Sequence, residues 1–235
     1  LIETHQMVDL KNLFLQNSCV FLHLVNPYFK NNHYQQSKGN YSTAKLTKRF
    51  NNLVYFRSMI GNQKNVLGII PARYNSSRLK GKPLALIDEK PMIQHVYERA
   101  SKVLNHVVVA TDDNRIADCV KEFGGQVQMT SPNHQTGTNR CLEAYLNWQK
   151  EHTTTPSVIL NIQGDEPLLN EDHLIKIINC FNDTQTTIAS LALILTEKDQ
   201  LNPGNVYLVK DKNENAIYFS RNPIPFLRDI EPKKW

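Results

Sequence analysis

The chain has 235 residues, of which 40% are apolar and 21% are charged, enough for one large α/β domain or two small ones. Its net charge of +5 is uneven: residues 1–64 hold eight Lys and Arg against two acids, whereas residues 65–235 hold 19 basic and 20 acidic residues. The second part is nearly neutral, so we expect no basic face for nucleic acid. No apolar run reaches the 18 or so residues needed for a membrane span.

The four cysteines are widely spaced and form no CxxC pair. This spacing predicts reduced, mostly buried thiols in the cytoplasm, and it argues against a disulfide framework or a zinc site.

Residues 1–64 show weak helical and strand periodicity, so we expect them to form a poorly ordered extension outside the catalytic fold. A targeting peptide is an alternative for this acid-poor stretch, although Arg is scarce and no cleavage pattern is visible. Translated upstream sequence ahead of a natural start at Met59 is another alternative.

From Val66 onward, strand patterns alternate with helix patterns. Strands are predicted at Val66–Pro71, His106–Thr111, Val127–Met129, Ser157–Ile162 and Thr187–Leu195, with an antiparallel pair at Val206–Val209 and Ala216–Ser220. Helices are predicted at Pro91–Leu104, from the capping residues Asp112 and Asp113 to Gly124, from about Thr138 to Lys150, and at Glu171–Phe181. This alternation indicates a three-layer α/β fold, in which helices cover both faces of a mostly parallel mixed sheet.

A polar loop with four cations follows the first buried strand. The cations are Arg73, Arg78, Lys80 and Lys82. Open α/β sheets bind ligands at the carboxyl ends of their strands, and clustered cations repel one another without an anion, so the loop suits a polyphosphate. A solvated basic loop is the alternative. A Walker loop is excluded because GxxxxGK[ST] is absent, and a dehydrogenase is disfavoured because no GxGxxG follows the strand.

The segment Asn161–Pro167 (NIQGDEP) follows another buried strand, so we expect it at the same edge of the sheet. Gly164 permits a tight turn that exposes Asp165 and Glu166. A carboxylate facing a cationic loop suits Mg²⁺, which takes oxygen ligands from protein and phosphates together. An ordinary acidic turn is the alternative.

Two further stretches carry polar groups. Met129–Arg140 (MTSPNHQTGTNR) is dense in hydrogen-bonding side chains and could contact a base and a ribose, but its threonines could equally cap a helix, with His134 merely polar. Tyr218–Arg221 (YFSR) ends a strand with an arginine that suits a carboxylate, or that is simply exposed at a sheet edge.

Together these motifs resemble those of the cytidylyltransferases that activate acidic sugars, and most closely the group acting on 3-deoxy-manno-octulosonate (Kdo). The family loop P-A-R-x-x-S-x-R-L-x-x-K-P is matched at every fixed position by residues 71–83, and QGDEP is matched in full. The family usually reads H-x-S-G-T-E/D-R, where this chain has Thr136 for Ser and Asn139 for the acid. Tyr207 stands where the family usually has Lys.

The resemblance implies a fold like that of the nucleotide-diphospho-sugar transferases. It also implies transfer of CMP from CTP to Kdo with release of pyrophosphate, for lipopolysaccharide biosynthesis, with Mg²⁺ as cofactor and a homodimer as the assembly. The catalytic cations would be Arg73, Arg78 and Lys82. The nucleotide would be bound by Pro71, Ala72, Arg73, Ser76, Arg78, Lys82, Ser131, Gln135 and Gly137, the sugar acid by Gln163 and Arg221, and Mg²⁺ by Asp165.

The resemblance covers about Asn65 to Asp229, and the family continues beyond that point. We therefore expect residues 65–235 to form a cytidylyltransferase domain without its C-terminal part, which in the family holds a second metal-binding Asp and much of the dimer surface. Two alternatives stay open: a cytidylyltransferase for sialic acid or another 2-keto-3-deoxy sugar acid, and a remnant that binds nucleotide without turnover.

Overall fold

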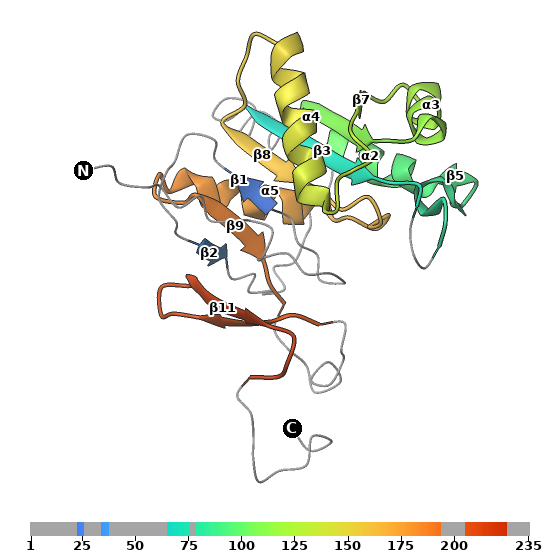
Figure 1. The fold of residues 1–235 in the computed structure, drawn as a ribbon. Coiled ribbons are helices and arrows are strands. Elements are labelled where there is room, and N and C mark those ends of the chain that lie inside the picture. The colour runs from blue at the N-terminus through green and yellow to red at the C-terminus, as the bar shows by residue number, and fades with distance from the viewer. Residues whose placement is uncertain (1–22, 26–33, 38–64, 76–78, 194–204, 225–235) are drawn as a thin grey trace, which may run out of the picture.

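The structure is a computed structural model that describes residues 23–25, 34–37, 65–75, 79–193 and 205–224 (Figure 1). Its main sheet has seven strands in the order β2-β9-β1-β8-β3-β6-β7. These strands are β1 (His23–Val25), β2 (Tyr34–Ser37), β3 (Val66–Ala72), β6 (His106–Thr111), β7 (Val127–Met129), β8 (Val158–Asn161) and β9 (Ile188–Leu191).

The centre of the sheet is parallel, as the continuous apolar runs of β3 and β6 predict, because strands buried on both faces lose the apolar–polar alternation. β3 pairs with β6 on one side and with β8 on the other, and β6 continues to β7. β1 is the antiparallel strand of this sheet, between β8 and β9. The predicted mostly parallel mixed sheet is therefore observed.

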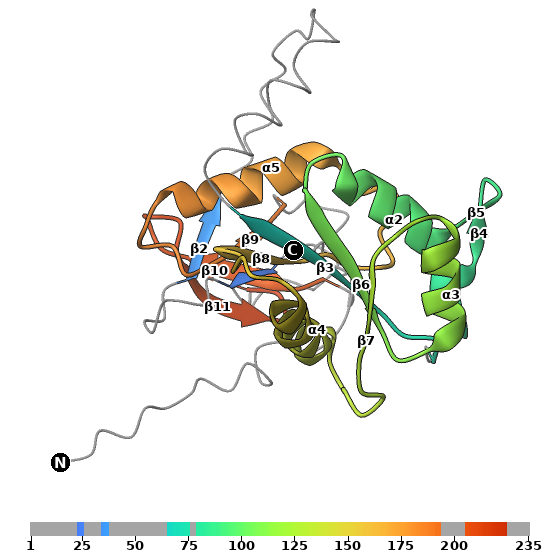
Figure 2. The same cartoon turned by 90° about the horizontal axis from the view of Figure 1, so that it is seen from above.

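Helices cover both faces of the sheet (Figure 2). The helices are α2 (Met92–Ser101), α3 (Asn114–Glu122), α4 (Gly137–Glu151) and α5 (Glu171–Asn179). α4 packs through Ala144 and Trp148 on the face that carries Leu67 and Ile69 of β3. α2, α3 and α5 cover the opposite face.

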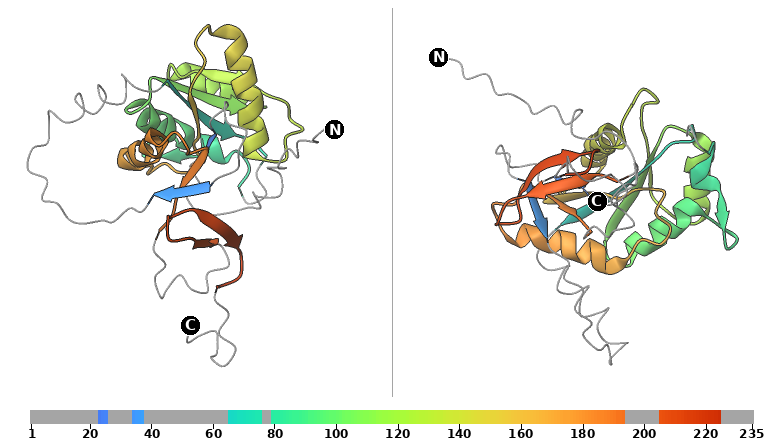
Figure 3. Two further views of the ribbon diagram at one scale, coloured as in Figure 1. Left: turned by 90° about the vertical axis from the view of Figure 1, so that its left-hand side faces the viewer. Right: turned by 90° about the horizontal axis from the view of Figure 1, so that it is seen from below.

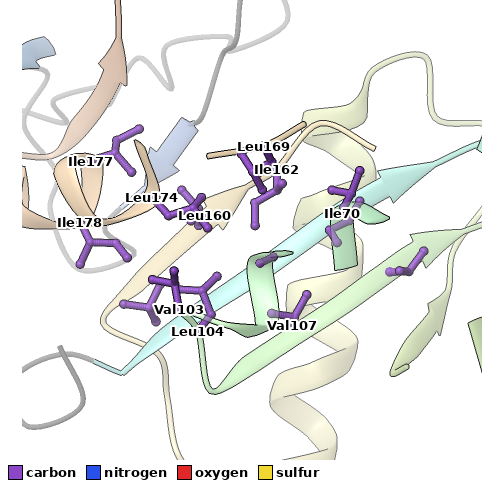
Figure 4. Close-up of a cluster of buried hydrophobic side chains, with 14 of the residues drawn as sticks. Ile70, Val103, Leu104, Val107, Leu160, Ile162, Leu169, Leu174, Ile177 and Ile178 are labelled. Carbon is purple, nitrogen blue, oxygen red and sulfur yellow. The ribbon is translucent and has the colours of Figure 1, made fainter. Parts of the chain in front are cut away.

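The larger of the two apolar cores lies between the sheet and α2, α3 and α5 (Figure 4). Ile70 of β3 and Leu160 of β8 belong to this core, and Leu174 and Ile177 of α5 lie on the Leu160 side of it. Each of these four side chains is fully buried, and burial of such a side chain stabilises the fold by roughly 1.5–3 kcal/mol.

Side-chain caps define the starts of three helices, among them α5, where Asn170 Oδ1 accepts the Asp172 backbone N–H at 2.9 Å. Asp113 caps α3 by accepting the Arg115 backbone N–H at 3.0 Å, as the sequence predicts. Thr136 caps α4, so this helix begins at Gly137 rather than Thr138. The predicted end of α2 at Leu104 is wrong: the helix ends at Ser101, and a tighter turn follows in which the Val103 N–H bonds to the Ala100 carbonyl oxygen.

Two hairpins stand apart from the main sheet (Figures 1 and 3). β10 (Tyr207–Lys210) and β11 (Ala216–Ser220) form the predicted antiparallel pair. β4 (Leu86–Ile87) and β5 (Lys90–Pro91) form a short hairpin that is not predicted from the sequence pattern. A predicted strand at Thr187–Leu195 is observed as the shorter β9, and its last two residues lie outside the described residues.

Residues 1–64 were expected to lie outside the catalytic fold. β1 and β2, which come from this segment, pair with β8 and β9 in the structure. The rest of the segment up to residue 64 lies outside the described residues, so the division of the chain at residue 64 stays a prediction.

Two more sequence expectations concern the described residues. Cys141 is buried, as predicted, whereas Cys119 and Cys180 are only half-buried, and Cys19 lies outside the described part of the chain. Within the residues that the structure describes, none of the helices has the length and apolar character needed to traverse a bilayer.

Candidate active site

Four parallel strands end at one edge of the sheet. In the register of the sheet, Ala72 at the end of β3 lies beside Thr111 at the end of β6, and Thr111 lies beside Met129 at the end of β7. On the other side of β3, Asn161 at the end of β8 lies beside Ile69. The cationic loop and the NIQGDEP turn therefore begin at the same edge, as the sequence predicts, and the polar loop after β7 begins there as well.

Pro71 lies where these loops converge. A Cβ added to Gly164 would lie 3.0 Å from the Pro71 carbonyl oxygen, so the turn after β8 contacts the β3 backbone directly. A Cβ added to Gly137 would lie 3.3 Å from the Pro71 ring carbon Cγ, so the start of α4 approaches the same residue. Glycine permits both close approaches because it has no side chain.

Lys82 and Asp165 join the cationic loop to the NIQGDEP turn. The Lys82 Nζ atom donates a hydrogen bond to Asp165 Oδ2 at 2.6 Å, across 83 positions of sequence. The side chains are 35% and 52% exposed, and ion pairs with such exposure contribute at most about 1 kcal/mol. The pair is therefore weak enough for charged groups of a ligand to replace either partner.

The other cations predicted for the site differ in whether the structure describes them. Arg73 follows β3 directly and its side chain is exposed at the sheet edge. Arg78 and Ser76 lie outside the described residues. Lys82 opens a short 3-10 helix, η2 (Lys82–Leu84), in which the next residue, Pro83, is buried.

The carboxylates of the NIQGDEP turn have unlike surroundings. Asp165 is exposed, whereas burial, together with the negative charge of Asp165, raises the pKa of Glu166 from 4.5 to about 7. Among the described residues, no three His, Cys, Asp or Glu side chains lie close enough together to hold a metal ion by themselves. The protein thus offers one or two carboxylate groups at this turn, a donor set that suits Mg²⁺ when phosphates and water supply the remaining oxygens.

A buried arginine fixes the start of the loop after β7. Arg140, in the first turns of α4, is 3% exposed. Its guanidinium donates to Thr130 Oγ1 at 2.6 Å and lies 3.2 Å from Asp112 Oδ2 at the end of β6. The charge of Arg140 is thereby paired inside the protein, so we assign it to holding the loop rather than to binding an anion.

Glu143 anchors the middle of the same loop. Its Oε2 atom accepts the Ser131 backbone N–H at 2.9 Å and also contacts His134 Nε2. The hydrogen bond from Ser131, reinforced by His134, lowers the pKa of Glu143 below its usual value, so the carboxylate stays charged. No sequence motif points to Glu143, and the sequence leaves two roles open for His134, which is a half-buried partner of Glu143 in the structure.

The end of this loop is the N-terminus of α4. Thr136 Oγ1 accepts the Asn139 backbone N–H at 3.2 Å, so the capping alternative for Thr136 is confirmed. Asn139 occupies the third helical position, where a Glu or Gln side chain completes a capping box. Gly137 is exposed as the first residue of the helix, and Gln135 is exposed just before it.

Two residues expected to bind the sugar acid lie in different parts of the fold. Gln163 is half-buried in the NIQGDEP turn, where its Nε2 atom lies 3.5 Å from Asn161 Oδ1. Arg221 follows β11 in the separate hairpin, not a strand of the main sheet. Their assignment to one ligand therefore stays a prediction.

The described edge combines exposed cations, an exposed carboxylate and a loop whose backbone is fixed by α4. Cations opposite a carboxylate can hold a phosphate chain together with a divalent metal, and such charge neutralisation with positioning is what phosphoryl transfer mostly requires from a protein. No side chain is placed as a covalent nucleophile by these contacts, and none is needed for such a reaction.

Known proteins are similar to this chain in sequence and in fold. A family model described as Cytidylyltransferase matches residues 67–233. The 3-deoxy-manno-octulosonate cytidylyltransferase of Parabacteroides distasonis is 47% identical over 174 residues, which make up 72% of this chain and 68% of that protein. The 8-amino-3,8-dideoxy-manno-octulosonate cytidylyltransferase of Shewanella woodyi is 47% identical over 170 residues, or 70% of this chain and 68% of that protein.

A solved structure is similar as well. It is described as CMP:2-keto-3-deoxy-manno-octonic acid synthetase complexed with CTP, is 38% identical, covers 70% of this chain and 67% of its own, and has a TM-score of 0.64. The predicted fold class is thereby confirmed. The chain spans about two thirds of the length of these relatives.

Proposed function

Because the chain belongs to the cytidylyltransferase family, we propose that it transfers CMP from CTP to 3-deoxy-manno-octulosonate and releases pyrophosphate. The observation that carries this proposal is the contact between Lys82 and Asp165, which joins the two motifs that the reaction needs. The CMP-sugar would serve lipopolysaccharide biosynthesis. We place the protein in the cytoplasm because its widely spaced cysteines form no CxxC pair and indicate a reducing compartment.

In the proposed reaction the anomeric hydroxyl of the sugar attacks the α-phosphorus of CTP. The new bond joins that oxygen to the α-phosphorus, the bond to the bridging oxygen of the leaving pyrophosphate breaks in line, and the hydroxyl proton passes to water. Lys82 and Arg73 would hold the triphosphate and stabilise the charge that develops on pyrophosphate. Arg78 is assigned to the same task by the sequence motif.

The loop after β7 would bind the cytidine. Support comes from its anchoring: Arg140 holds the Thr130 side chain and Glu143 holds the Ser131 backbone N–H, while Gln135 is exposed. A preorganised loop loses less conformational freedom when a ligand binds. We assign the nucleotide to residues of this loop and of the segment after β3, namely Ser131, Gln135, Gly137, Pro71, Ala72 and Ser76.

We assign Mg²⁺ to Asp165 at the same edge. Bound there, Mg²⁺ would neutralise part of the phosphate charge. In the structure Lys82 donates a hydrogen bond to the Asp165 carboxylate at the sheet edge. When CTP binds, Lys82 would exchange this partner for a phosphate oxygen, and the carboxylate would become available to the metal.

The sugar acid is assigned to Gln163 and Arg221, the latter as a bidentate partner of the sugar carboxylate. A homodimer is proposed from the family resemblance alone. Relatives of equal identity are named for 3-deoxy-manno-octulosonate and for its 8-amino analogue, so the identity of the sugar is decided by assay.

The test is pyrophosphate release by the purified chain with CTP, Mg²⁺ and a panel of Kdo, the 8-amino analogue and a sialic acid. We expect release with CTP and Kdo, and a fall in kcat of about 10²–10³-fold in Lys82→Ala, the size expected for loss of a preorganised charge. Lys121→Ala is the matched control, because Lys121 is an exposed lysine of α3 paired only with Asp118.

Three outcomes contradict the proposal or part of it. Faster pyrophosphate release with another sugar acid than with Kdo would show that the other acid is the substrate. CTP binding by calorimetry without any product would make the chain a nucleotide-binding remnant. Unchanged turnover in Lys82→Ala would refute the phosphate role of Lys82.

A further inference from the structure

Tyr74 closes the base of the cationic loop. The Gly81 backbone N–H donates to the Tyr74 carbonyl oxygen at 2.8 Å. Gly81 has φ +72°, and a Cβ added there would lie 3.1–3.3 Å from three atoms of the Tyr74 side chain. The ring of Tyr74 therefore lies against the glycine that immediately precedes Lys82.

The same ring is held by a cation from α3. The guanidinium carbon of Arg115 lies 3.3 Å from the centroid of the Tyr74 ring. Arg115 is itself fixed by Asp113, which accepts from Arg115 Nε at 2.9 Å and from Nη2 at 2.6 Å. These bonds lower the pKa of Asp113, so the carboxylate that orients the guanidinium stays charged.

These contacts form a continuous path toward Lys82. Asp113 caps α3 and orients Arg115, Arg115 stacks on Tyr74, and Tyr74 bonds to and covers Gly81. α3 and η2, which begins at Lys82, are neighbours in the fold. The path ends at the ammonium group that bonds to Asp165.

We propose that Tyr74 and Arg115 are positioning residues that fix Gly81 and thereby hold the Lys82 ammonium group where it meets the nucleotide phosphates. The contact of Lys82 with nucleotide phosphates rests on the proposed function. The restraint of Lys82 by the Tyr74 ring and the Arg115 guanidinium concerns the protein without nucleotide and is tested in that form.

The first experiment measures how freely Lys82 moves and reacts. The purified full chain is labelled with an amine acetylating reagent, and mass spectrometry gives the acetylation rate of Lys82. Tyr74→Leu removes the aromatic face and Arg115→Gln removes the cation, and each should raise the Lys82 rate about two- to fivefold, the size of an exposed cation–π contact. Tyr74→Phe keeps the aromatic ring, so the Lys82 acetylation rate in this variant should equal that of the wild type.

Lys121→Gln is the matched control, since it also removes one cation from α3 but one paired with Asp118, not with Tyr74. Circular dichroism shows whether each variant is folded, and Arg115→Gln keeps the test decisive if Tyr74→Leu does not fold, because Arg115 is an exposed side chain. A Lys82 rate that is unchanged in Arg115→Gln, or equally raised in Lys121→Gln, would overturn the proposal.

The second experiment asks whether the effect on catalysis passes through Lys82. Tyr74→Leu should lower kcat/KM for CTP by about two- to fivefold in the wild-type background, and should cause no further loss in the Lys82→Ala background. An equal loss in both backgrounds would show that Tyr74 acts elsewhere. Absence of CTP turnover in the wild-type chain would refute the proposed function, while the labelling rates would still decide whether the restraint exists.

Discussion

Replacing Gly164 by alanine tests whether the contact with Pro71 sets the geometry of the site. The added Cβ would lie 3.0 Å from the Pro71 carbonyl oxygen, 3.4 Å from Ile70 Cγ2 and 3.5 Å from Ile93 Cδ1. Ile70 and Ile93 are fully buried, and the carbonyl belongs to a central strand, so the turn itself must move by a few tenths of an ångström. Asp165, the next residue, moves with it.

The expected cost has two parts. Overpacking of a buried site costs about 1–3 kcal/mol, and the lower entropy of the unfolded chain with alanine offsets about 0.4–1 kcal/mol of this. We expect a net loss of about 1–2 kcal/mol in the free energy of unfolding by urea. Because a misplacement of about 1 Å can cost a hundredfold in rate, a smaller shift of Asp165 should lower kcat/KM about tenfold.

Gly124→Ala is the matched control. Gly124 has φ +78°, so alanine there is strained by about 1 kcal/mol or more, but no atom lies within 4 Å of the added Cβ. Both variants should lose comparable stability, and only Gly164→Ala should lose pyrophosphate release. Wild-type kcat/KM in Gly164→Ala would show that this contact does not position Asp165.

Two further predictions concern stability. The raised pKa of Glu166 means that the folded protein binds this proton more tightly than the unfolded chain, so stability is lost as the pH rises from 4.5 to about 7. In urea unfolding, the free energy of unfolding of Glu166→Gln should be about 1–2 kcal/mol higher than that of the wild type above pH 7, after allowance for screening by solvent. Below pH 4.5 the two free energies should be equal. An advantage that is the same at both pH values would contradict the role of ionisation. Glu89 has φ +64° in the two-residue turn between β4 and β5, where glycine is favoured, so Glu89→Gly should raise the unfolding free energy by about 0.5–1 kcal/mol, and a decrease would show that the turn is not strained.

The elements predicted best from the sequence are those whose signal is local. Val107–Ala110 is an uninterrupted apolar run with β-branched residues, and the observed bounds of the strand that contains it, His106–Thr111, are those predicted. The hairpin at Leu86–Pro91 was missed because its turn, Asp88-Glu89, lacks the Asn or Gly that usually marks positive φ values. The two positive φ values of this turn are therefore not signalled by its residue types.

The site was predictable to the extent that topology decides it. Parallel strands place their carboxyl ends together, so the meeting of the Lys82 and Asp165 segments followed from the strand pattern. The partners of Glu143 were not predictable, because a helix turn and a loop were brought together by the packing of α4 on the sheet. The stacking of Arg115 on Tyr74 likewise depends on where α3 packs.

The convergence on Pro71 separates the frame of the site from the groups that distinguish substrates. Backbone atoms, a proline ring and two glycines make the contacts at this point, so the outward-facing side chains can change while the frame is kept. Relatives with equal identity to this chain are named for sugars that differ at one substituent. Sugar preference can thus diverge in evolution, or be redesigned, without rebuilding the scaffold beneath it.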